Sequence, residues 1–195
     1  FNEERVSIIK PLALEGIEGT GSMGDDTALA VLSTMPRSIY DYFRQQFAQV
    51  TNPPIDSLRE ASVMSLEACF GPELNIFEET EDHAKRIVST SPVLSHKKLK
   101  SLLDNSYFRA ESFNLVYSPK LKLKDALDSL TSKVVKAVRK GVVIIHLDEI
   151  LPKGDALSIN ALLGLGCIHQ ELVKLGLRSD ANLIVSSATA RDTHQ

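Results

Sequence analysis

The sequence has no tryptophan, only two cysteines among its 195 residues, and no apolar run long enough to cross a membrane. Its longest apolar runs, residues 142–147 and 161–168, fall far short of the ~18 residues that a membrane-spanning helix needs. Cys69 and Cys167 lie far apart and outside a C-x-x-C spacing, which excludes a disulfide framework and indicates small apolar residues in a reduced compartment. The absences leave a globular protein of one domain, or of two.

Charge of one sign is also lacking, since 22 basic residues face 25 acidic ones and the formal net charge is -3. Such a balance creates no field that would gather nucleic acid or an acidic membrane surface, so we expect neither as a partner. The first residues, Phe1 to Arg5, show no charged-then-apolar leader and no initiator methionine. We therefore expect cytosolic material that is a piece of a longer polypeptide.

Motifs for phosphate binding and nucleophilic catalysis are incomplete. Residues 142–149 fit an apolar strand that ends in Asp-Glu, but no Gly-Lys-Ser or Gly-Lys-Thr holds phosphates upstream, and G-x-S-x-G is absent. The spacing Gly19-x-Gly21-x-x-Gly24 lacks a preceding apolar strand, and Asp25 or Asp26 would repel a pyrophosphate. We expect one of these aspartates to cap a helix over residues 27–33 instead.

A metal site could draw on four residues near the end of the chain: His146, Asp148, Cys167 and His169. On a helix, Cys167 and His169 lie about 200° apart, so a single ion does not easily take both. We interpret His169 as a satisfied core histidine and Asp148 and Glu149 as loop residues that face solvent or a neighbouring domain. The sequence alone thus predicts no catalytic residue, no cofactor-binding residue and no metal ligand.

The first 80 residues carry mainly helical patterns. Residues 1–20 have mixed polarity and predict short extended or irregular pieces, whereas Pro36 to Val50 predicts a helix with Ile39 and Phe43 on its core-facing side and Tyr40 on the remaining surface. After a double-proline corner, Asp56 or Ser57 starts a further helix, with a candidate capping box, that should end by Gly71-Pro72.

From residue 81 onward, short apolar runs alternate with longer helical patterns, which is typical of a parallel sheet with crossover helices. The pattern predicts strand, helix, strand, helix, strand, helix and strand in that order. The expected segments are a strand at Pro92–Ser95, a basic helix near Lys97–Asp104, a strand at Phe113–Tyr117, a helix at Leu123–Val138, a strand at Val142–Leu147, a helix at Ser158–Leu175 and a strand at Ala181–Ser186.

One family carries the same motifs in the same order: the central domain of the large subunit of glutamate synthase, which this sequence resembles over most of its length. The resemblance is densest from Gly21 to Glu60, which includes Y-F-R-Q-Q-F-A-Q-V-T-N-P from Tyr42 to Pro53, continues through Val63–Leu66, Gly71–Thr80 and Ser91–Ser95, and returns at Ala161–Leu163, Gly166, His169, Gly176–Arg178 and Ala190–His194.

The resemblance implies a role in a larger enzyme, an oxidoreductase with glutamine amidotransferase activity. In that family an N-terminal amidotransferase hydrolyses glutamine, and ammonia passes through an internal tunnel to an FMN-binding (β/α)8 barrel, where 2-oxoglutarate becomes glutamate. The central domain connects the two catalytic domains, helps wall the tunnel and is a rudimentary relative of the barrel. FMN and an iron-sulfur cluster would belong to the parent enzyme, in the cytoplasm or a plastid, and the fragment alone would be inactive.

The resemblance also predicts the fold and a candidate tunnel wall. We expect one α/β central domain over residues 1–195, in which a mainly helical part (1–80) precedes parallel β/α units (81–195) that resemble a partial FMN-type barrel. Small polar side chains could pass neutral ammonia, and the tunnel or interdomain candidates are Ser22, Met23, Asp25, Asp26, Thr27, Thr51 and Asn52. The alternative is a stand-alone α/β module whose ligand would lie at strand ends near Ser95, Ser118, Asp148 and Ser187.

The sequence departs from the family pattern at three places. Ala28 stands where the family usually has proline, His146-Leu147-Asp148-Glu149 replaces a strand end that usually reads Ser-Asp-Arg, and Ser186-Ser187 replaces an acidic residue. Contacts that those family residues make are therefore not carried over to this chain.

Overall fold

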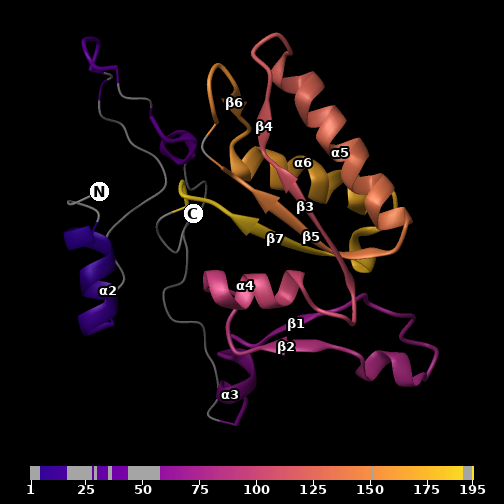
Figure 1. Cartoon of the computed structure of the whole chain (residues 1–195). Coiled ribbons are helices and arrows are strands. Elements are labelled where there is room, and N and C mark those ends of the chain that lie inside the picture. Colours follow the sequence, from indigo (N-terminus) through magenta and orange to yellow (C-terminus); the bar gives the residue numbers. More distant parts are fainter. Residues whose placement is uncertain are drawn as a thin grey trace. The chain divides into compact units, whose positions relative to one another are not determined.

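The computed structural model describes residues 5–16, 28, 30–34, 37–43, 58–150, 152–190 and 195 (Figure 1). The chain divides into two compact units, one formed by Phe1–Pro54 with Ala188–Gln195 and the other by Ile55–Ser187. In these described ranges we find no helix with the length and apolar content that a bilayer crossing requires.

The first unit begins with a helix where we expected irregular pieces. A π-helical turn, η1 (Arg5–Ile9), leads into α2 (Lys10–Glu15). Pro11 lies in the first turn of α2, where its missing N–H group is not needed, and Gly16 ends the helix with a φ of 64°. The proline and the glycine both favour this helix, so the expectation for residues 1–20 was wrong over the part that is described.

Two further helices expected in the first unit are not formed as predicted. Of the helix expected at residues 27–33, the described positions 28 and 30–33 are not helical, and Val31 and Leu32 are almost fully exposed in a turn. A helix this short needs a buried apolar face to be stable, and these side chains provide none. Among the described positions 37–43 of the helix predicted from Pro36, only the 3-10 turn η2 (Ile39–Tyr42) is helical, and Phe43 has extended backbone.

The burial of this segment also differs from the prediction. Tyr40 is buried, with 4% of its surface exposed, whereas Phe43 is 43% exposed. The tighter 3-10 winding turns the side chains relative to an α-helix, so the 3.6-residue stripe does not apply. Residues 44–50, which held the rest of the expected helix, lie outside the described residues.

The second unit starts with a short helix followed by a strand, and the long helix expected between residues 56 and 71 is absent from its described positions. Only α3 (Glu60–Val63) is helical, with Arg59 and not Ser57 at its N-cap. The strand β1 (Ala68–Phe70) pairs antiparallel with β2 (Ile87–Ser89). Pairing with a segment about 20 residues away outweighs the local helical pattern, because strand formation depends on tertiary partners.

The parallel sheet of the second unit confirms the predicted β/α units. Its strand order is β3-β5-β7, and both pairs are parallel. The elements are β3 (Arg109–Asn114), α5 (Leu123–Arg139), β5 (Val142–Asp148), α6 (Ala161–Lys174) and β7 (Asn182–Ser186). The apolar run of β5 is central and largely buried, as its composition predicted.

The predicted strand at residues 113–117 is divided in two. Leu115 is fully buried between β3 and the short strand β4 (Val116–Tyr117), which pairs antiparallel with β6 (Leu157–Ser158). The Leu115 N–H donates to the Asp148 carbonyl, and the Leu115 carbonyl accepts from the Ile159 N–H. The chain therefore leaves the parallel sheet at Leu115 and starts a separate ladder.

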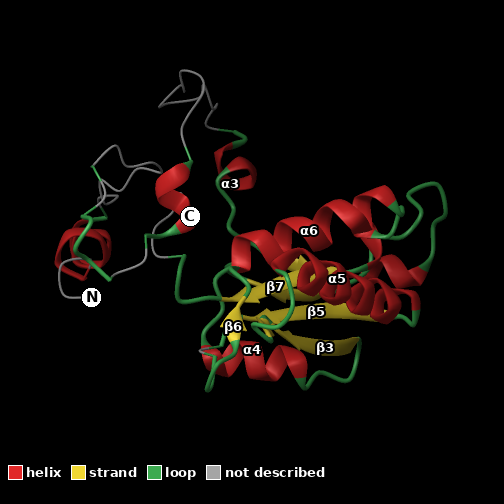
Figure 2. Cartoon of the chain, turned by 90° about the horizontal axis from the view of Figure 1, so that it is seen from above, coloured by secondary structure: helices red, strands yellow, loops and turns green. Residues whose placement is uncertain are grey.

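The two faces of the parallel sheet are covered by different layers. Helices α5 and α6 pack on one face, and α4 (His96–Leu103) lies on the other (Figure 2). Ile145 and Leu147 point to the α5–α6 side, whereas Ile144 packs with Phe70 and Leu102 on the α4 side. The strand expected at residues 92–95 is instead a bend that ends in the α4 N-cap, Ser95.

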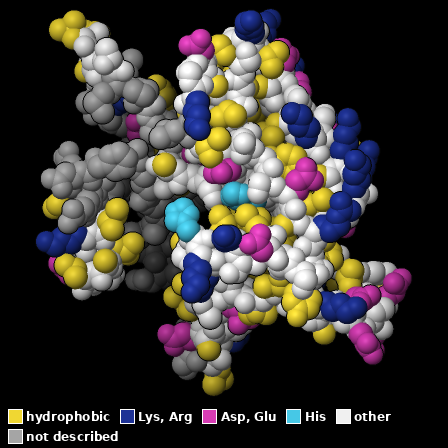
Figure 3. All heavy atoms as spheres, in the orientation of Figure 1, with side chains coloured by type: hydrophobic (Ala, Val, Ile, Leu, Met, Phe, Trp, Pro, Cys, Tyr) yellow, Lys and Arg dark blue, Asp and Glu magenta, His cyan; other side chains and the backbone are white. Residues whose placement is uncertain are grey.

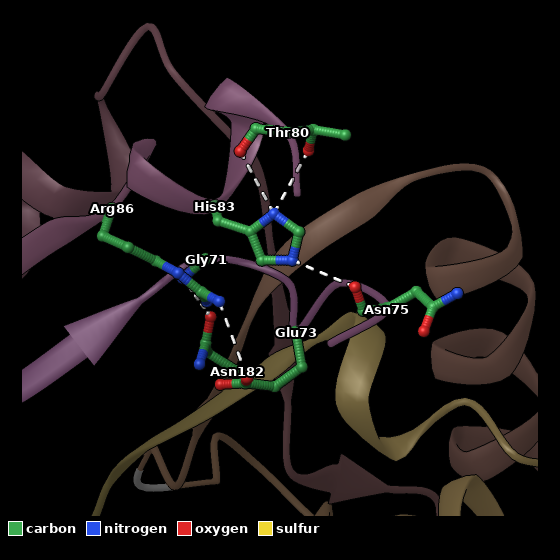
Figure 4. A network of polar contacts seen from close by, with 7 residues as sticks. All are labelled: Gly71, Glu73, Asn75, Thr80, His83, Arg86 and Asn182. Atoms are coloured by element: carbon green, nitrogen blue, oxygen red, sulfur yellow. Dashed lines mark hydrogen bonds and ion pairs between the residues drawn. The ribbon is translucent and has the colours of Figure 1, made fainter. Parts of the chain in front are cut away.

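A polar network attaches the β1–β2 layer to the start of β7 (Figure 4). The Gly71 N–H donates to the Asn182 Oδ1 at 2.8 Å, and the Glu73 N–H donates to the Ser179 carbonyl. Gly71 has a φ of 150°, and a Cβ there would lie 2.9 Å from the Arg86 Cδ, so glycine is required at this contact. The Arg86 Nη2 in turn lies 3.6 Å from the Glu73 Oε2, as an ion pair.

The sheet does not close into a barrel. Among the described residues, β3 and β7 are the two edges of a three-stranded sheet, and no further strand joins them. The structure therefore confirms a mixed α/β fold with parallel β/α units, while the resemblance to a barrel stays a prediction.

Candidate functional site

The carboxyl ends of the parallel strands are the place where α/β folds bind ligands, and here this edge carries several polar side chains. Asn114, Asp148 and Ser186 end the three strands and lie at matching register positions. Glu149 and Ser187 follow directly after β5 and β7. We call the group formed by Ser112, His146, Glu149, Ser186 and Ser187 the edge cluster.

A buried histidine connects all three strands on the α4 side of the sheet. The His146 Nδ1 lies 3.0 Å from the Ser112 Oγ on β3, and the His146 Nε2 lies 2.8 Å from the Ser186 Oγ on β7. His146 is only 5% exposed and is the only polar side chain among the buried residues that the structure describes. A neutral imidazole can donate to one hydroxyl and accept from the other, so both of its nitrogens are satisfied without charge.

The stability of the second unit should depend on the protonation of His146. Burial lowers the pKa of His146 below its ordinary value of 6.5, and the nearby Asp148 opposes this shift. The folded pKa lies below the unfolded one, so the stabilisation is complete above about pH 6.5 and is lost as the pH falls through the folded pKa. In urea unfolding between about pH 7.5 and pH 5, a His146→Gln variant should lose less stability than the unmodified chain. Equal losses would contradict a buried neutral histidine.

A carboxylate lies where an anionic ligand would otherwise be held. One oxygen of Glu149, Oε1, accepts from the Ala161 N–H at 3.2 Å, in the first turn of α6, and the other, Oε2, accepts from the Ser187 hydroxyl. The adjacent Asn160 Oδ1 accepts from the Leu162 N–H. The positive end of α6 is therefore neutralised by the chain's own acid, in the position that a phosphate occupies at other helix N-termini.

The residues predicted for a ligand-binding module do not form one site. Asp148 and Ser187 lie on neighbouring strand ends, but the Ser187 hydroxyl is engaged with Glu149. The Ser95 Oγ accepts from the Lys98 N–H as the cap of α4, and the Ser118 Oγ accepts from the Lys120 N–H in the turn after β4. Glu149 is a loop residue, as interpreted from the sequence, and its carboxylate contacts the start of α6 and the residue after β7, whereas Asp148 is the last residue of β5 and not a loop residue.

The metal-site alternatives are not brought together either. Within the part of the chain that the structure describes, no three His, Cys, Asp or Glu side chains form a group that could hold a metal ion. His169 is satisfied, because the Arg178 Nε donates to its Nδ1 at 3.1 Å, but it is half-buried on α6 and is not a core residue. Cys69 and Cys167 form no disulfide with each other, and both side chains are exposed.

The residues predicted to line a tunnel or an interdomain contact lie outside the described residues. This applies to all seven of them, Ser22, Met23, Asp25, Asp26, Thr27, Thr51 and Asn52. The three glycines of the Gly19-x-Gly21-x-x-Gly24 spacing fall in the same undescribed segment. Their roles stay predictions from the sequence.

Comparison with known proteins gives a single consistent family. A family model described as "Glutamate synthase central domain" matches residues 1–195. The chain is 40% identical over 198 residues to "Ferredoxin-dependent glutamate synthase 2" of Synechocystis sp., covering 98% of this chain and 13% of that protein. It is 38% identical to the chloroplastic ferredoxin-dependent enzyme of Oryza sativa subsp. japonica, covering 100% of this chain and 12% of that protein. It is 35% identical to "Glutamate synthase [NADH]" of Saccharomyces cerevisiae, covering 98% of this chain and 9% of that protein.

Proposed function

Because the chain belongs to the glutamate synthase central domain family, we propose that it is the connecting domain of a glutamate synthase. It spans only 9% to 13% of the length of the relatives described above. We propose that its partners are the amidotransferase and FMN-binding domains of the same parent chain, which together make glutamate from glutamine and 2-oxoglutarate. In this proposal residues 1–195 form one central domain that links the two catalytic domains and contributes to the wall of the ammonia tunnel.

The observation that carries a scaffolding role is the edge cluster. Ligand sites in α/β folds use free polar groups at the carboxyl ends of strands. Here His146 bonds with Ser112 and Ser186, while Glu149 bonds with Ser187 and with the first turn of α6. Side chains that satisfy one another hold the strands in register and leave less capacity for a substrate. This arrangement supports a structural role in preference to a stand-alone ligand-binding module.

The arrangement of the sheet is compatible with a rudimentary barrel. Consecutive strands β3, β5 and β7 are neighbours, and both connecting helices pack on the same face. A (β/α)8 barrel has the same local order, with neighbouring strands in sequence and all helices outside. We propose that the three strands are a partial barrel wall. FMN and the iron-sulfur cluster then belong to other domains of the parent enzyme, and the residues of this chain hold neither.

The setting of the parent enzyme follows the relatives. Rice and spinach relatives are named chloroplastic, whereas the Synechocystis and yeast names carry no plastid term. We propose a cytoplasmic or plastid location on this basis.

Blocking the proposed tunnel should uncouple the two activities of the full-length parent enzyme. A large side chain at Ser22 and Asn52 (Ser22→Phe with Asn52→Phe) should leave glutamine hydrolysis active but lower the amount of 2-oxoglutarate converted to glutamate per glutamine hydrolysed about tenfold, with free ammonia released. Ser106→Phe, at an exposed loop position of the second unit, is the matched control and should leave the ratio unchanged. An unchanged ratio in the double variant would argue against tunnel residues at these positions.

The isolated chain provides a separate test of the non-catalytic role. Calorimetric titration with FMN and with 2-oxoglutarate should give no binding heat. Saturable binding of either compound would favour the ligand-binding module, and turnover by the chain alone would favour an independent enzyme.

A further inference from the structure

An apolar groove lies between β2 and α4, on the face of the second unit opposite α5 and α6. It has a volume of about 670 Å³. Its floor is formed by Phe70, Ile87, Leu94 and Leu102, which continue into the core around Ile144. Tyr107 lines the same groove and is 80% exposed. A floor of this kind can accept apolar side chains of a partner.

The charge of this groove is entirely positive. Lys97 and Lys98 line it, and none of its lining residues, all within the described part of the chain, is acidic. Both lysines lie in the first turn of α4, which contains no acidic residue. Cations there are opposed by the positive end of the helix dipole, so the groove attracts carboxylates more strongly than two isolated lysines would. We call the surface formed by Phe70, Ile87, Leu94, Lys97, Lys98 and Leu102 the basic groove.

A tight turn in the same unit has the complementary composition. The Glu78 N–H donates to the Asn75 carbonyl, and the Phe77 N–H donates to the Asn75 Oδ1, so residues 75–78 form a closed turn. Ile76 and Phe77 at its tip are 81% and 90% exposed. Two glutamates, Glu78 and Glu79, follow directly. We call residues 75–79 the apolar turn.

The apolar turn is held in place before any partner binds. The His83 Nε2 lies 3.2 Å from the Asn75 carbonyl, and the His83 Nδ1 lies 3.1 Å from the Thr80 Oγ1 (Figure 4). In the space-filling view, acidic side chains lie at the lower right, over the short helix η3 (Glu81–Ala84) between β1 and β2, with basic side chains beside them (Figure 3). A fixed turn loses little conformational entropy when its two apolar side chains are buried.

We propose that the apolar turn of one copy of this chain docks in the basic groove of a second copy. Ile76 and Phe77 would lie on the apolar floor, and Glu78 and Glu79 would face Lys97 and Lys98. Within one copy the turn does not fill the groove, because Ile76 and Phe77 are exposed. Reciprocal docking about a two-fold axis would satisfy both surfaces at once. This proposal rests on the described contacts and is independent of the proposed function.

Sedimentation equilibrium of the 195-residue chain tests the self-association. A contact between one five-residue turn and one groove is small and therefore weak, so the average mass should rise above 21.4 kDa between about 10 µM and about 1 mM. Phe77→Ser should weaken the association at least about tenfold, since the variant loses the largest side chain of the turn that docking would bury. Val173→Ser, at an exposed apolar position on α6, is the matched control and should not change it. Circular dichroism would verify that each variant is folded.

A charge exchange identifies the partner surface. The double variant Lys97→Glu/Lys98→Glu should lose self-association, and so should Glu78→Lys/Glu79→Lys. An equal mixture of the two should associate again, because the reversed charges then face each other. Lys120→Glu/Lys122→Glu, which reverses two exposed lysines outside the groove, should associate like the unmodified chain. A chain that stays monomeric at 1 mM, a Phe77→Ser variant that associates normally, or a mixture without regained association would each overturn the proposal.

Discussion

Replacing Ile145 with alanine is expected to lower the free energy of unfolding of the second unit by about 2–5 kcal/mol. Ile145 is fully buried in the middle of β5, in the core cluster that packs against α5 and α6. Alanine would remove the transfer energy of three carbon atoms and leave a cavity that the surrounding strands and helices cannot easily fill. Urea unfolding followed by circular dichroism measures the loss, with an unchanged denaturant slope.

A matched control for this variant is available in the same segment. Ile150 is 38% exposed just beyond the end of β5, so Ile150→Ala should cost less than about 1 kcal/mol. If Ile145→Ala and Ile150→Ala lost the same stability, the result would contradict the burial of β5 between two packed layers. Ile145→Val should lose much less stability than Ile145→Ala, because valine is only one methylene group smaller than isoleucine.

Replacing Glu149 with alanine is expected to lower the free energy of unfolding by about 2–4 kcal/mol. The change removes the carboxylate that accepts from the Ala161 N–H in the first turn of α6. It also leaves the Ser187 hydroxyl without this partner. It also removes the negative charge that stabilises the positive end of the helix. Hydrogen bonds to charged groups are stronger than hydrogen bonds between neutral groups. The free energy of unfolding of Glu149→Gln should therefore lie between that of the unmodified chain and that of Glu149→Ala. Thermal and urea unfolding would measure both.

The control for Glu149 is a carboxylate at the opposite end of the same helix. The Glu171 Oε2 lies 3.6 Å from the Lys174 Nζ in an exposed ion pair. Glu171→Ala should therefore lower the free energy of unfolding by less than about 1 kcal/mol. A Glu149→Ala loss as small as that would show that the capping contact does not hold α6 to the sheet.

The β/α units could be predicted because their patterns are long and strongly periodic. The apolar positions of α5 recur on one face, and the β-branched run of β5 has no competing helical pattern. The ends of these elements also follow local chemistry, such as Gly141 after α5. Local sequence was sufficient wherever one face of an element is buried over its whole length.

The β1–β2 layer could not be predicted because its stability comes from distant partners. Residues 60–70 have a helical pattern, yet Ala68–Phe70 pairs with Ile87–Ser89 and packs under α4. The edge cluster was missed for the same reason. Glu149 and Ser187 are 38 positions apart, and only the parallel pairing of β5 with β7 brings them together. The sequence did place Asp148, Glu149 and Ser187 at strand ends, but it gave no sign that Glu149 and Ser187 bind each other.

The contact between Gly71 and Asn182 has a consequence for the order of assembly. The two residues are separated by 111 positions, so the bond closes a loop that includes every β/α unit. Such long-range closure carries a high entropic cost early in folding. The β1–β2 layer should therefore dock after the last strand is in place, and during synthesis it would wait until β7 has left the ribosome. The Gly71 amide would then be a late-protected reporter in pulsed hydrogen exchange.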